Sequence, residues 1–479
     1  MSLAPKRRTS PAEGEFLFEL DPEPLQEAMT AYGGIPVFLR AVRSLDVGGR
    51  ANRHLQVKQR QRGFDEGSYV ESFLVLNALG GECLDDFERL REDEGLPQML
   101  GHEVPSPEAA RKFLYQFHDE QKIEQAQREL PAGQVSYIPE ESAPLRGLAQ
   151  VNRELVEEMG RRCADQKIAT IDVDATIIES WKEQAQPTYQ GGQGYQPVLA
   201  LWAEMDLVVA DEFRDGNVPA HSALLPITKR AFQALPETVT EYFFRGDSAC
   251  WERELLNWLR DEKRSDGPSG PITFAVSVRM TSGLKKQILR LPDSFWKPYR
   301  SDSQTESECA DVLNYWPEEE ERPEGAGPLR YTAIRIRKRQ GALFADGSEA
   351  KYFAVASNQW KWEPKKLLEW HREKAGSIEA LHDVVKNDLA GGVMPCARFG
   401  SNAAWLRLAL MTHNVLTALK RIGLSEPWLR ARPKRLRFQI FCSPGRLVHH
   451  ARQLLLRVCR LKSQLAEWGE VWRLLPIGT

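Results

Sequence analysis

The stretch that decides the fold is QKIATIDVDATIIES, residues 166–180. Its isoleucines and its valine give it the apolar content of a buried strand. Asp172 and Asp174 interrupt it, and side chains two residues apart on a strand point to the same face. Buried carboxylates are costly unless they are paired or bind a metal. The stretch therefore predicts a core strand with an acidic face, and the alternation alone does not choose between the two acids.

Composition bounds the class of protein. The 479 residues are enough for roughly two to four domains. Hydrophobic residues at 42% and charged residues at 27% are typical of a soluble globular chain, and a net charge of −3 gives no overall attraction to nucleic acid. Seven scattered cysteines without a CxxC pair indicate a reducing compartment. No apolar run has the length of a membrane helix or of a signal peptide, so we expect a cytoplasmic protein without a membrane partner.

The order of elements after residue 166 predicts the fold class. Three successive strands are expected, followed by helix, strand, helix and strand. Their ranges are 167–178, 194–206, 207–216, 221–235, 239–247, 251–267 and 270–279. This order predicts an α/β fold with a ribonuclease H-like core.

The rest of the chain divides around that core. We expect a disordered tail, a helical N-terminal DNA-binding region, a core in two pieces, a β-rich insertion between them and a basic helical C-terminal region. The ranges are 1–15, 16–160, 161–280 with 355–395, 281–354 and 396–479. Within the N-terminal region two helices joined by a tight turn predict either a helix-turn-helix, with Arg111 and Lys112 near the start of its second helix, or a helical bundle with solvated charges.

The C-terminal region carries a local excess of positive charge. From residue 421 to 479 there are twelve Lys and Arg against three Asp and Glu, a balance of +9. Such a cluster favours a nucleic-acid footprint, because neutralising phosphates releases counterions. A solvated basic face is the alternative.

Three places carry carboxylates that a purely structural role does not require. They are the pair Asp172 and Asp174, Asp247 at the end of the strand 239–247, and Glu379 on a late helix. Taken singly, a solvated edge, a helix cap and a helix-dipole contact explain them. Together they predict a cluster that binds Mg²⁺, with Mn²⁺ as the alternative, because hard cations prefer oxygen ligands. His382, one turn after Glu379, is expected either beside the carboxylates, in support of them, or on the helix surface, and we favour the surface.

Five stretches carry a resemblance to a known family. They are IDVDAT, YQPVLALWAEMDLVVADEFRDGNV, FFRGDSACWERELLNWL, HREKAGSIEALHDVVKNDLAGG and SPGRLVHHARQLLLRV. In order and spacing the chain resembles, from about residue 70 to 470, the DDE-type transposases of bacterial insertion sequences. It is most similar to the branch numbered thirteen-eighty within the superfamily typified by insertion sequence four.

The resemblance implies a catalytic triad. In such enzymes the first acid directly precedes a small residue and a threonine, which selects Asp174 over Asp172. The second and third acids match Asp247 and Glu379, and their spacing of 132 positions fits the β-rich insertion of the family. The implied chemistry is hydrolysis at a transposon end by two Mg²⁺ ions, followed by attack of the freed 3′-hydroxyl on target DNA.

The resemblance also implies DNA contacts. The family signature on the late helix has Tyr, Arg, Glu and Lys at fixed spacing; here Glu379 and Lys386 keep that spacing, while Arg372 and Ala375 replace the Tyr and the Arg. The expected phosphate contacts are Lys386, Arg372, Lys374 and Arg245. Some relatives stack a flipped base on a tryptophan of the insertion, and the candidates here are Trp296, Trp316, Trp360 and Trp362.

The implied partners are double-stranded DNA, as transposon inverted repeats and target, and a second copy of the chain in a synaptic complex. The implied location is the bacterial cytoplasm, at the nucleoid. Two alternatives remain at this stage: a ribonuclease H-like nuclease that cuts without strand transfer, and a catalytically inactive, domesticated DNA-binding protein.

Overall fold

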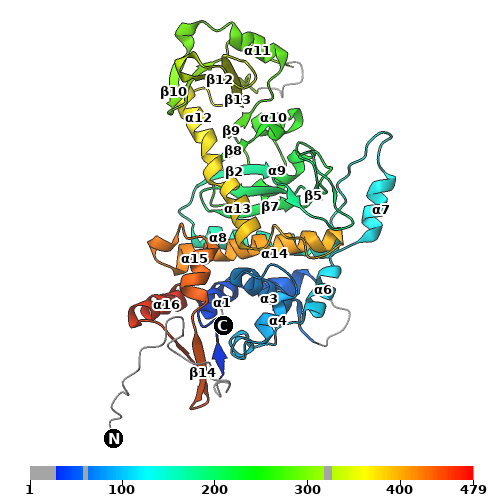
Figure 1. Ribbon diagram of the computed structural model, residues 1–479, viewed down its shortest axis with the longest axis vertical. Helices are drawn as coiled ribbons and strands as arrows, with labels where there is room; N and C mark the ends of the chain where they lie inside the picture. The colour runs from blue at the N-terminus through cyan, green and yellow to red at the C-terminus, as the bar shows by residue number, and fades with distance from the viewer. Residues whose placement is uncertain (1–27, 58–62, 318–325, 478–479) are drawn as a thin grey trace, which may run out of the picture.

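A nine-stranded mixed sheet forms the centre of the molecule (Figure 1). The computed structural model describes residues 28–57, 63–317 and 326–477, so the expected tail 1–15 lies outside the described residues. The strand order in the sheet is β10-β11-β12-β13-β9-β8-β2-β6-β7. The expected mixture of strands and helices is therefore present, and two smaller three-stranded sheets, β1-β14-β15 and β3-β5-β4, accompany the large one.

The acidic stretch 166–180 supplies β2 (Ile168–Ala175), in the interior of this sheet. On one side β2 pairs antiparallel with β6 (Val198–Trp202), which pairs with β7 (Leu207–Glu212). On the other side it runs parallel to β8 (Glu241–Gly246), which runs parallel to β9 (Ile272–Ser277). Helices α9 (Leu224–Gln233) and α10 (Arg253–Arg260) provide the connections between these strands. Each strand and helix expected between residues 167 and 279 is present.

The inserted segment extends the central sheet instead of forming a separate one. After α11 (Ser282–Leu289) it supplies β10 (Lys297–Ser301), β11 (Thr305–Asp311), β12 (Arg330–Lys338) and β13 (Ala350–Ser357). These four strands form an antiparallel meander, and β13 pairs antiparallel with β9. In Figure 1 they occupy the top of the molecule, at the end farthest from the N-terminal helices.

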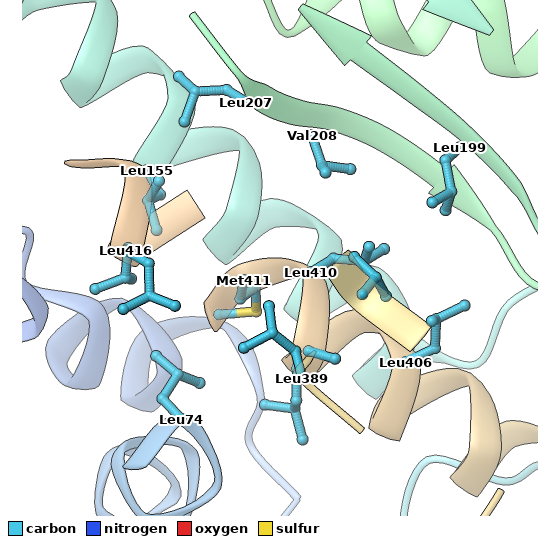
Figure 2. Close-up of a cluster of buried hydrophobic side chains, with 14 of the residues drawn as sticks. Leu74, Leu155, Leu199, Leu207, Val208, Leu389, Leu406, Leu410, Met411 and Leu416 are labelled. Atoms are coloured by element: carbon cyan, nitrogen blue, oxygen red, sulfur yellow. The ribbon is translucent and has the colours of Figure 1, made fainter. Parts of the chain in front are cut away.

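Helix α14 (Phe399–Ala418) lies between the sheet and the N-terminal helices. All of its residues except Phe399 are buried, as expected for a helix that is covered on every side. It contacts α1 (Ile35–Ser44), α3 (Glu66–Leu79), α6 (Pro107–Tyr115), α8 (Ala143–Arg162) and β7. Figure 2 shows Leu406, Leu410 and Met411 of α14 among side chains from both layers.

Polar side chains close the free edge of the sheet at β7. The backbone N–H of Val208 donates to Asn414 Oδ1, and the carbonyl of Val208 accepts from Asn414 and Asn152. Arg407 is buried and donates to both Asp211 and Glu141. An exposed strand edge is a template for unwanted pairing, so these contacts protect β7 while they join it to α8 and α14.

The C-terminal region is not wholly helical, so the expectation is wrong for residues 445–458. These residues form the hairpin of β14 (Gly445–His450) and β15 (Gln453–Val458), and β14 also pairs with β1 (Met29–Thr30). The two turn residues, Ala451 and Arg452, have φ values of 47° and 66°. A tight two-residue hairpin needs positive φ, but Asn and Gly usually provide it, so the turn has no sequence signal. Helices α15 (Pro433–Leu436) and α16 (Lys462–Leu474) flank the hairpin region.

Candidate active site

Two carboxylates lie at the carboxyl ends of two neighbouring parallel strands. Val173 on β2 is in register with Gly246 on β8, so Asp174, near the end of β2, and Asp247, the first residue after β8, lie at the same end of the sheet. In open α/β sheets, binding sites lie at the carboxyl ends of such strands. Asp247 also begins a short 3₁₀ helix, where its Oδ1 accepts a hydrogen bond from Ala249 N at 2.9 Å.

Helix α13 (Ile378–Asp388) brings the third carboxylate to this edge. Glu379 lies in its first turn, and Lys374 lies in the short helical segment before it. The ammonium of Lys374 is 3.1 Å from Glu379 Oε1 and 4.0 Å from Asp174 Oδ2. Asp174 and Glu379 therefore flank one cationic atom, although 205 residues separate them in sequence.

The pKa of Asp174 reflects the burial of its carboxyl group and the charges around it. Burial raises the pKa of Asp174 to about 6; the negative charges of Asp247 and Glu379 add to the increase, and Lys374 opposes it. The same three carboxylates raise the pKa of Lys374 above its ordinary value, although burial alone acts to lower it. Asp174 and Lys374 therefore each respond to the charges of Asp247 and Glu379 as well as to one another.

Asp172, the other acid of the strand, has a different environment. It is fully buried, and its two oxygens accept from Arg245 Nε at 2.7 Å and Arg245 Nη2 at 2.9 Å. The hydroxyl of Ser377 also donates to Asp172 Oδ2. Its oxygens are committed to these partners, so Asp172 holds the structure together at the base of the cluster.

Arg245 is not presented to DNA, contrary to the expectation from sequence. It is 3% exposed. Besides Asp172, its guanidinium donates to the carbonyl of Trp370 at 2.8 Å and to Glu373 at 3.1 Å. The segment 370–377 is therefore bound to β2 and β8 by the Asp172–Arg245 pair, and this segment leads directly into Glu379. Arg245 and Asp172 thus join the segment before Glu379 to the two central strands.

The other predicted DNA contacts lie in several places. Lys386 is on α13 and donates to the carbonyl of Ile177, just beyond Asp174, at 2.6 Å; burial lowers its pKa, although Asp174 and Glu179 act to raise it. Lys374 is buried and directed to the carboxylates. Arg372 is exposed at the end of α12 (Pro364–Arg372).

Arg111 and Lys112 lie on α6, whose N-cap Ser106 accepts from Ala109 N. Both pair with Glu108, at 3.0 Å and 3.4 Å. Helices α4 (Asp86–Arg91) and α5 (Leu96–Leu100) lie between α3 and α6, so these two are not joined by the tight turn expected of a helix-turn-helix. Both α3 and α6 contact α14, which is the packing expected of a helical bundle.

His382 is not a surface residue as expected. Its side chain is 11% exposed, and its Nδ1 lies 4.0 Å from Asp174 Oδ2. Burial, together with the nearby charges of Lys386 and Lys374, lowers its pKa to about 3. The ring is therefore neutral at physiological pH and adds no positive charge to the cluster. Its spacing of three residues from Glu379 is the only sequence signal that placed it on the same face.

The donor chemistry of the cluster fits a hard divalent cation. Asp174, Asp247 and Glu379 offer only oxygen atoms, and two of these carboxylates already flank a positive charge, the ammonium of Lys374. Within residues 28–57, 63–317 and 326–477, no three His, Cys, Asp or Glu side chains stand in an arrangement ready to hold a metal. The three carboxylates therefore fit the ion by their chemistry, and binding requires their side chains to close around it.

Comparison with known proteins identifies the family. The family model described as transposase DDE domain group 1 matches residues 26–474. The chain belongs to the DDE transposases of this group. This membership supports transposase function, and DDE transposases generally use divalent metal ions, which agrees with the donor chemistry of the cluster.

This DDE transposase was also compared with solved structures and with curated proteins. A solved structure of the piggyBac transposase, in a synaptic complex with hairpin DNA, is similar with a TM-score of 0.48 and 11% sequence identity. The match covers 84% of this chain and 78% of that chain. No curated protein matches the sequence. Among the helices of the described residues, none is long and apolar enough to cross a membrane.

Proposed function

We propose that this DDE transposase cuts DNA at the ends of a transposon and joins the freed 3′-hydroxyl to target DNA. The proposal rests on two features: Asp174 and Glu379 flank the ammonium of Lys374, and strand register places Asp247 beside Asp174 at the same end of the sheet. The family match over residues 26–474 supplies the class of reaction. Within the family, we assign the chain to the thirteen-eighty branch of insertion sequences. We also propose that strands β2, β6, β7, β8 and β9 form a ribonuclease H-like core.

The chemistry requires activation of a weak nucleophile and stabilisation of a leaving oxygen. Two bound Mg²⁺ ions, or Mn²⁺, would supply both effects at a phosphodiester. Asp174, Asp247 and Glu379 would hold them, because they are the oxygen donors that meet at this edge. Water first displaces a 3′-oxygen from phosphorus, and the resulting 3′-hydroxyl then displaces the corresponding oxygen in target DNA.

The surrounding residues position these carboxylates. The Asp172–Arg245 pair fixes the segment 370–377, and this segment fixes the start of α13 and hence Glu379. Charged groups stabilise a transition state most when they are already in place before the reaction. Asp172 and Arg245 therefore contribute to catalysis by holding Glu379 in place, without contacting DNA themselves. Lys386, anchored beside Asp174 by the carbonyl of Ile177, is the best-placed cation for a phosphate near the site.

The proposed partners are the inverted repeats, the target DNA and a second copy of the chain, since two ends must be cut and joined together. The proposed core consists of residues 161–280 and 355–395, with the β-rich insertion 281–354 between them and the tail 1–15 at the start of the chain. The proposed DNA-binding parts are residues 16–160 and the basic C-terminal region 396–479. The hairpin β14–β15 belongs to the latter and contributes Arg446, Arg452 and Arg457.

A plasmid assay tests the proposal. The substrate is a supercoiled plasmid in which the DNA flanking this gene brackets a marker, incubated with purified protein, MgCl₂ and a target plasmid. We expect excision and joined products with the wild type, neither with Asp174→Asn or Glu379→Gln, and both with the control Glu254→Gln, which alters an exposed acid on α10. Cutting without joining would identify a nuclease, and DNA binding without Mg²⁺-dependent cutting would identify a domesticated protein; either result would overturn the proposal.

A further inference from the structure

The segment that follows β2 forms a small sheet with two exposed aromatic rings. Its strands are β3 (Ile178–Glu179), β4 (Gln186–Pro187) and β5 (Gln193–Tyr195), in the order β3-β5-β4. Residues 178–195 are called the aromatic loop below. Trp181 is 83% exposed and Tyr189 is 74% exposed. Burying such rings is favourable by about 1.5–3 kcal/mol each, so exposed rings of this size indicate a surface that another molecule covers.

The two rings leave the sheet at the same end. The backbone N–H of Ser180 donates to Gln193 O at 3.0 Å, and that of Thr188 donates to Gly192 O at 3.0 Å. Trp181 and Tyr189 each follow one of these bonds by one residue. The end of the sheet between them is the turn at Gly191 and Gly192, where positive φ values of 87° and 81° permit the reversal.

The opposite end of the aromatic loop is held firmly. Tyr195 is buried, and its hydroxyl accepts from Asn402 Nδ2 at 3.1 Å. A Cβ atom at Gly194 would lie 2.2 Å from the carbonyl oxygen of Ile178, so β3 and β5 approach too closely for any larger residue. The rings are therefore carried on a fixed base rather than on a free loop, and a fixed base lowers the entropy lost when they bind.

The aromatic loop adjoins the proposed active site. The two residues just before the loop are both held by hydrogen bonds. The backbone N–H of Thr176 donates to the carbonyl of Pro197 at 2.9 Å, and the ammonium of Lys386 donates to the carbonyl of Ile177. Ile177, Ile178 and Glu179 line one open groove together with residues Lys386, Asn387, Arg432 and Lys434. Seven residues separate Asp174 from Trp181, a span of at most about 25 Å. Trp181 therefore lies no farther than this span from Asp174, on the segment that leads out of the proposed active site.

The chemistry of the tip suits nucleobases. Residues 180–193, SWKEQAQPTYQGGQ, contain four glutamines, one Lys and one Glu, so the tip has no net charge to repel a polyanion. Aromatic rings stack on unpaired bases of any sequence, and glutamine amides form hydrogen bonds with base edges. A protein partner or a membrane is less suited to a tip that is uncharged, rich in amides and next to a groove that contains Lys386.

We propose that Trp181 and Tyr189 contact DNA by stacking on unpaired bases beside the bond that is cut. This role is distinct from that of the insertion tryptophans Trp296, Trp316, Trp360 and Trp362, which lie on a different part of the sheet or the segments next to it. The inference rests on the proposed function, because the position of the rings has meaning only if the cluster at Asp174 cuts DNA.

Binding of two DNA probes tests the inference. The probes are a fluorescent oligo(dT) of twenty nucleotides and a blunt duplex of equal length, measured by anisotropy at fixed salt with the full chain. We expect Trp181→Ala and Tyr189→Ala each to weaken binding of oligo(dT) by about 5- to 150-fold, from a loss of 1–3 kcal/mol for each stacked base. Binding of the duplex should change by less than about twofold, because its bases already stack on one another.

Two controls show whether the aromatic ring itself is responsible. Trp181→Phe should restore most of the affinity for oligo(dT), whereas Trp181→Leu, which is apolar but not aromatic, should not. The slope of log Kd against log salt should stay the same in all variants, because no phosphate contact is removed. Equal affinity of the wild type and the Ala variants, equal losses on both probes, or full rescue by Leu would overturn the inference.

The same experiment separates this inference from the proposed function. If the wild type cuts the plasmid and Asp174→Asn does not, the proposed function stands, and unchanged oligo(dT) binding by Trp181→Ala then refutes the aromatic loop alone. If the wild type binds neither probe and cuts no DNA, the proposed function itself is refuted.

Discussion

Asp172 and Asp174 stand two residues apart on the same face of β2, yet they have opposite electrostatic environments. Asp172 is fully buried and receives two hydrogen bonds from the guanidinium of Arg245. Asp174 is 15% exposed, has two other carboxylates nearby and lies 4.0 Å from its nearest cation, Lys374. The fold therefore gives the charge of Asp172 a close partner and leaves the charge of Asp174 without one. The unpaired charge lowers the stability of the folded protein, as is common at functional sites.

The first prediction follows from the raised pKa of Asp174. Because its folded pKa of about 6 lies above the ordinary 3.8, the folded protein binds a proton that the unfolded chain releases, and stability falls as pH rises from about 4 to 6. Above pH 6 the cost is constant at about 2–3 kcal/mol. In buffer with EDTA, Asp174→Asn should raise the free energy of unfolding by up to this amount at pH 8 and leave it unchanged below pH 4. Urea unfolding at both pH values measures the difference.

The matched substitution Asp172→Asn should have the opposite sign. Removing one partner of a buried ion pair typically costs about 3–5 kcal/mol, and here it leaves Arg245, among the described residues, with only the exposed carboxylate of Glu373 as a counter-charge. The same urea titrations measure this loss. If Asp172→Asn stabilised the protein, or if Asp174→Asn destabilised it by a similar amount, the assignment of the two acids would have to be reversed.

The second prediction concerns Ser377, whose hydroxyl joins the start of α13 to Asp172. Ser377→Ala should lower the free energy of unfolding by about 1–3 kcal/mol, because a buried carboxylate loses a donor. It should also reduce cleavage, since Glu379 follows two residues later. Measuring cleavage well below the unfolding temperature separates positioning from stability. The control Ser425→Ala removes an exposed hydroxyl that donates to Glu467 far from the cluster, and cleavage should not change.

The third prediction concerns Lys374. Its charge opposes the increase in the pKa of Asp174, so Lys374→Met should destabilise the protein in EDTA above pH 6. Added MnCl₂ should restore the loss, because a divalent cation supplies the missing positive charge. Differential scanning fluorimetry should therefore record a larger rise in Tm on adding Mn²⁺ for Lys374→Met than for the wild type. An equal rise for both proteins would show that the metal binds elsewhere; Lys285→Met, on α11, is the control.

The fourth prediction separates phosphate contacts from base contacts. Lys386→Met should weaken binding of duplex DNA and reduce the slope of log Kd against log salt by about 1, which is the expected effect of losing one phosphate contact. Arg245→Met should leave that slope unchanged, because its guanidinium is 3% exposed and fully engaged by protein groups. A lower slope for Arg245→Met would show that it does contact DNA.

The apolar pattern predicted the elements around β2 well, because buried strands and amphipathic helices leave a periodic signal. It could not predict the partners of Asp172 and Asp174. Arg245 lies 73 residues away and reaches Asp172 only through the parallel register of β2 and β8. The burial of Lys374 depends on the packing of α13, so a residue that was expected at the DNA surface lies among the carboxylates. The hairpin at residues 445–458 was missed because Ala451 and Arg452 do not signal a turn.

The central claim is that Asp174, Asp247 and Glu379 form one metal-binding centre, and iron-directed cleavage of the protein tests it most directly. Fe²⁺ is added in place of Mg²⁺, ascorbate and peroxide generate hydroxyl radicals at the bound ion, and fragment masses locate the backbone cuts. The account predicts cuts near residues 174, 247 and 379 together, suppressed by excess Mg²⁺ and lost together in Asp174→Asn. Cuts that cluster elsewhere, or that persist unchanged in Asp174→Asn, would contradict it.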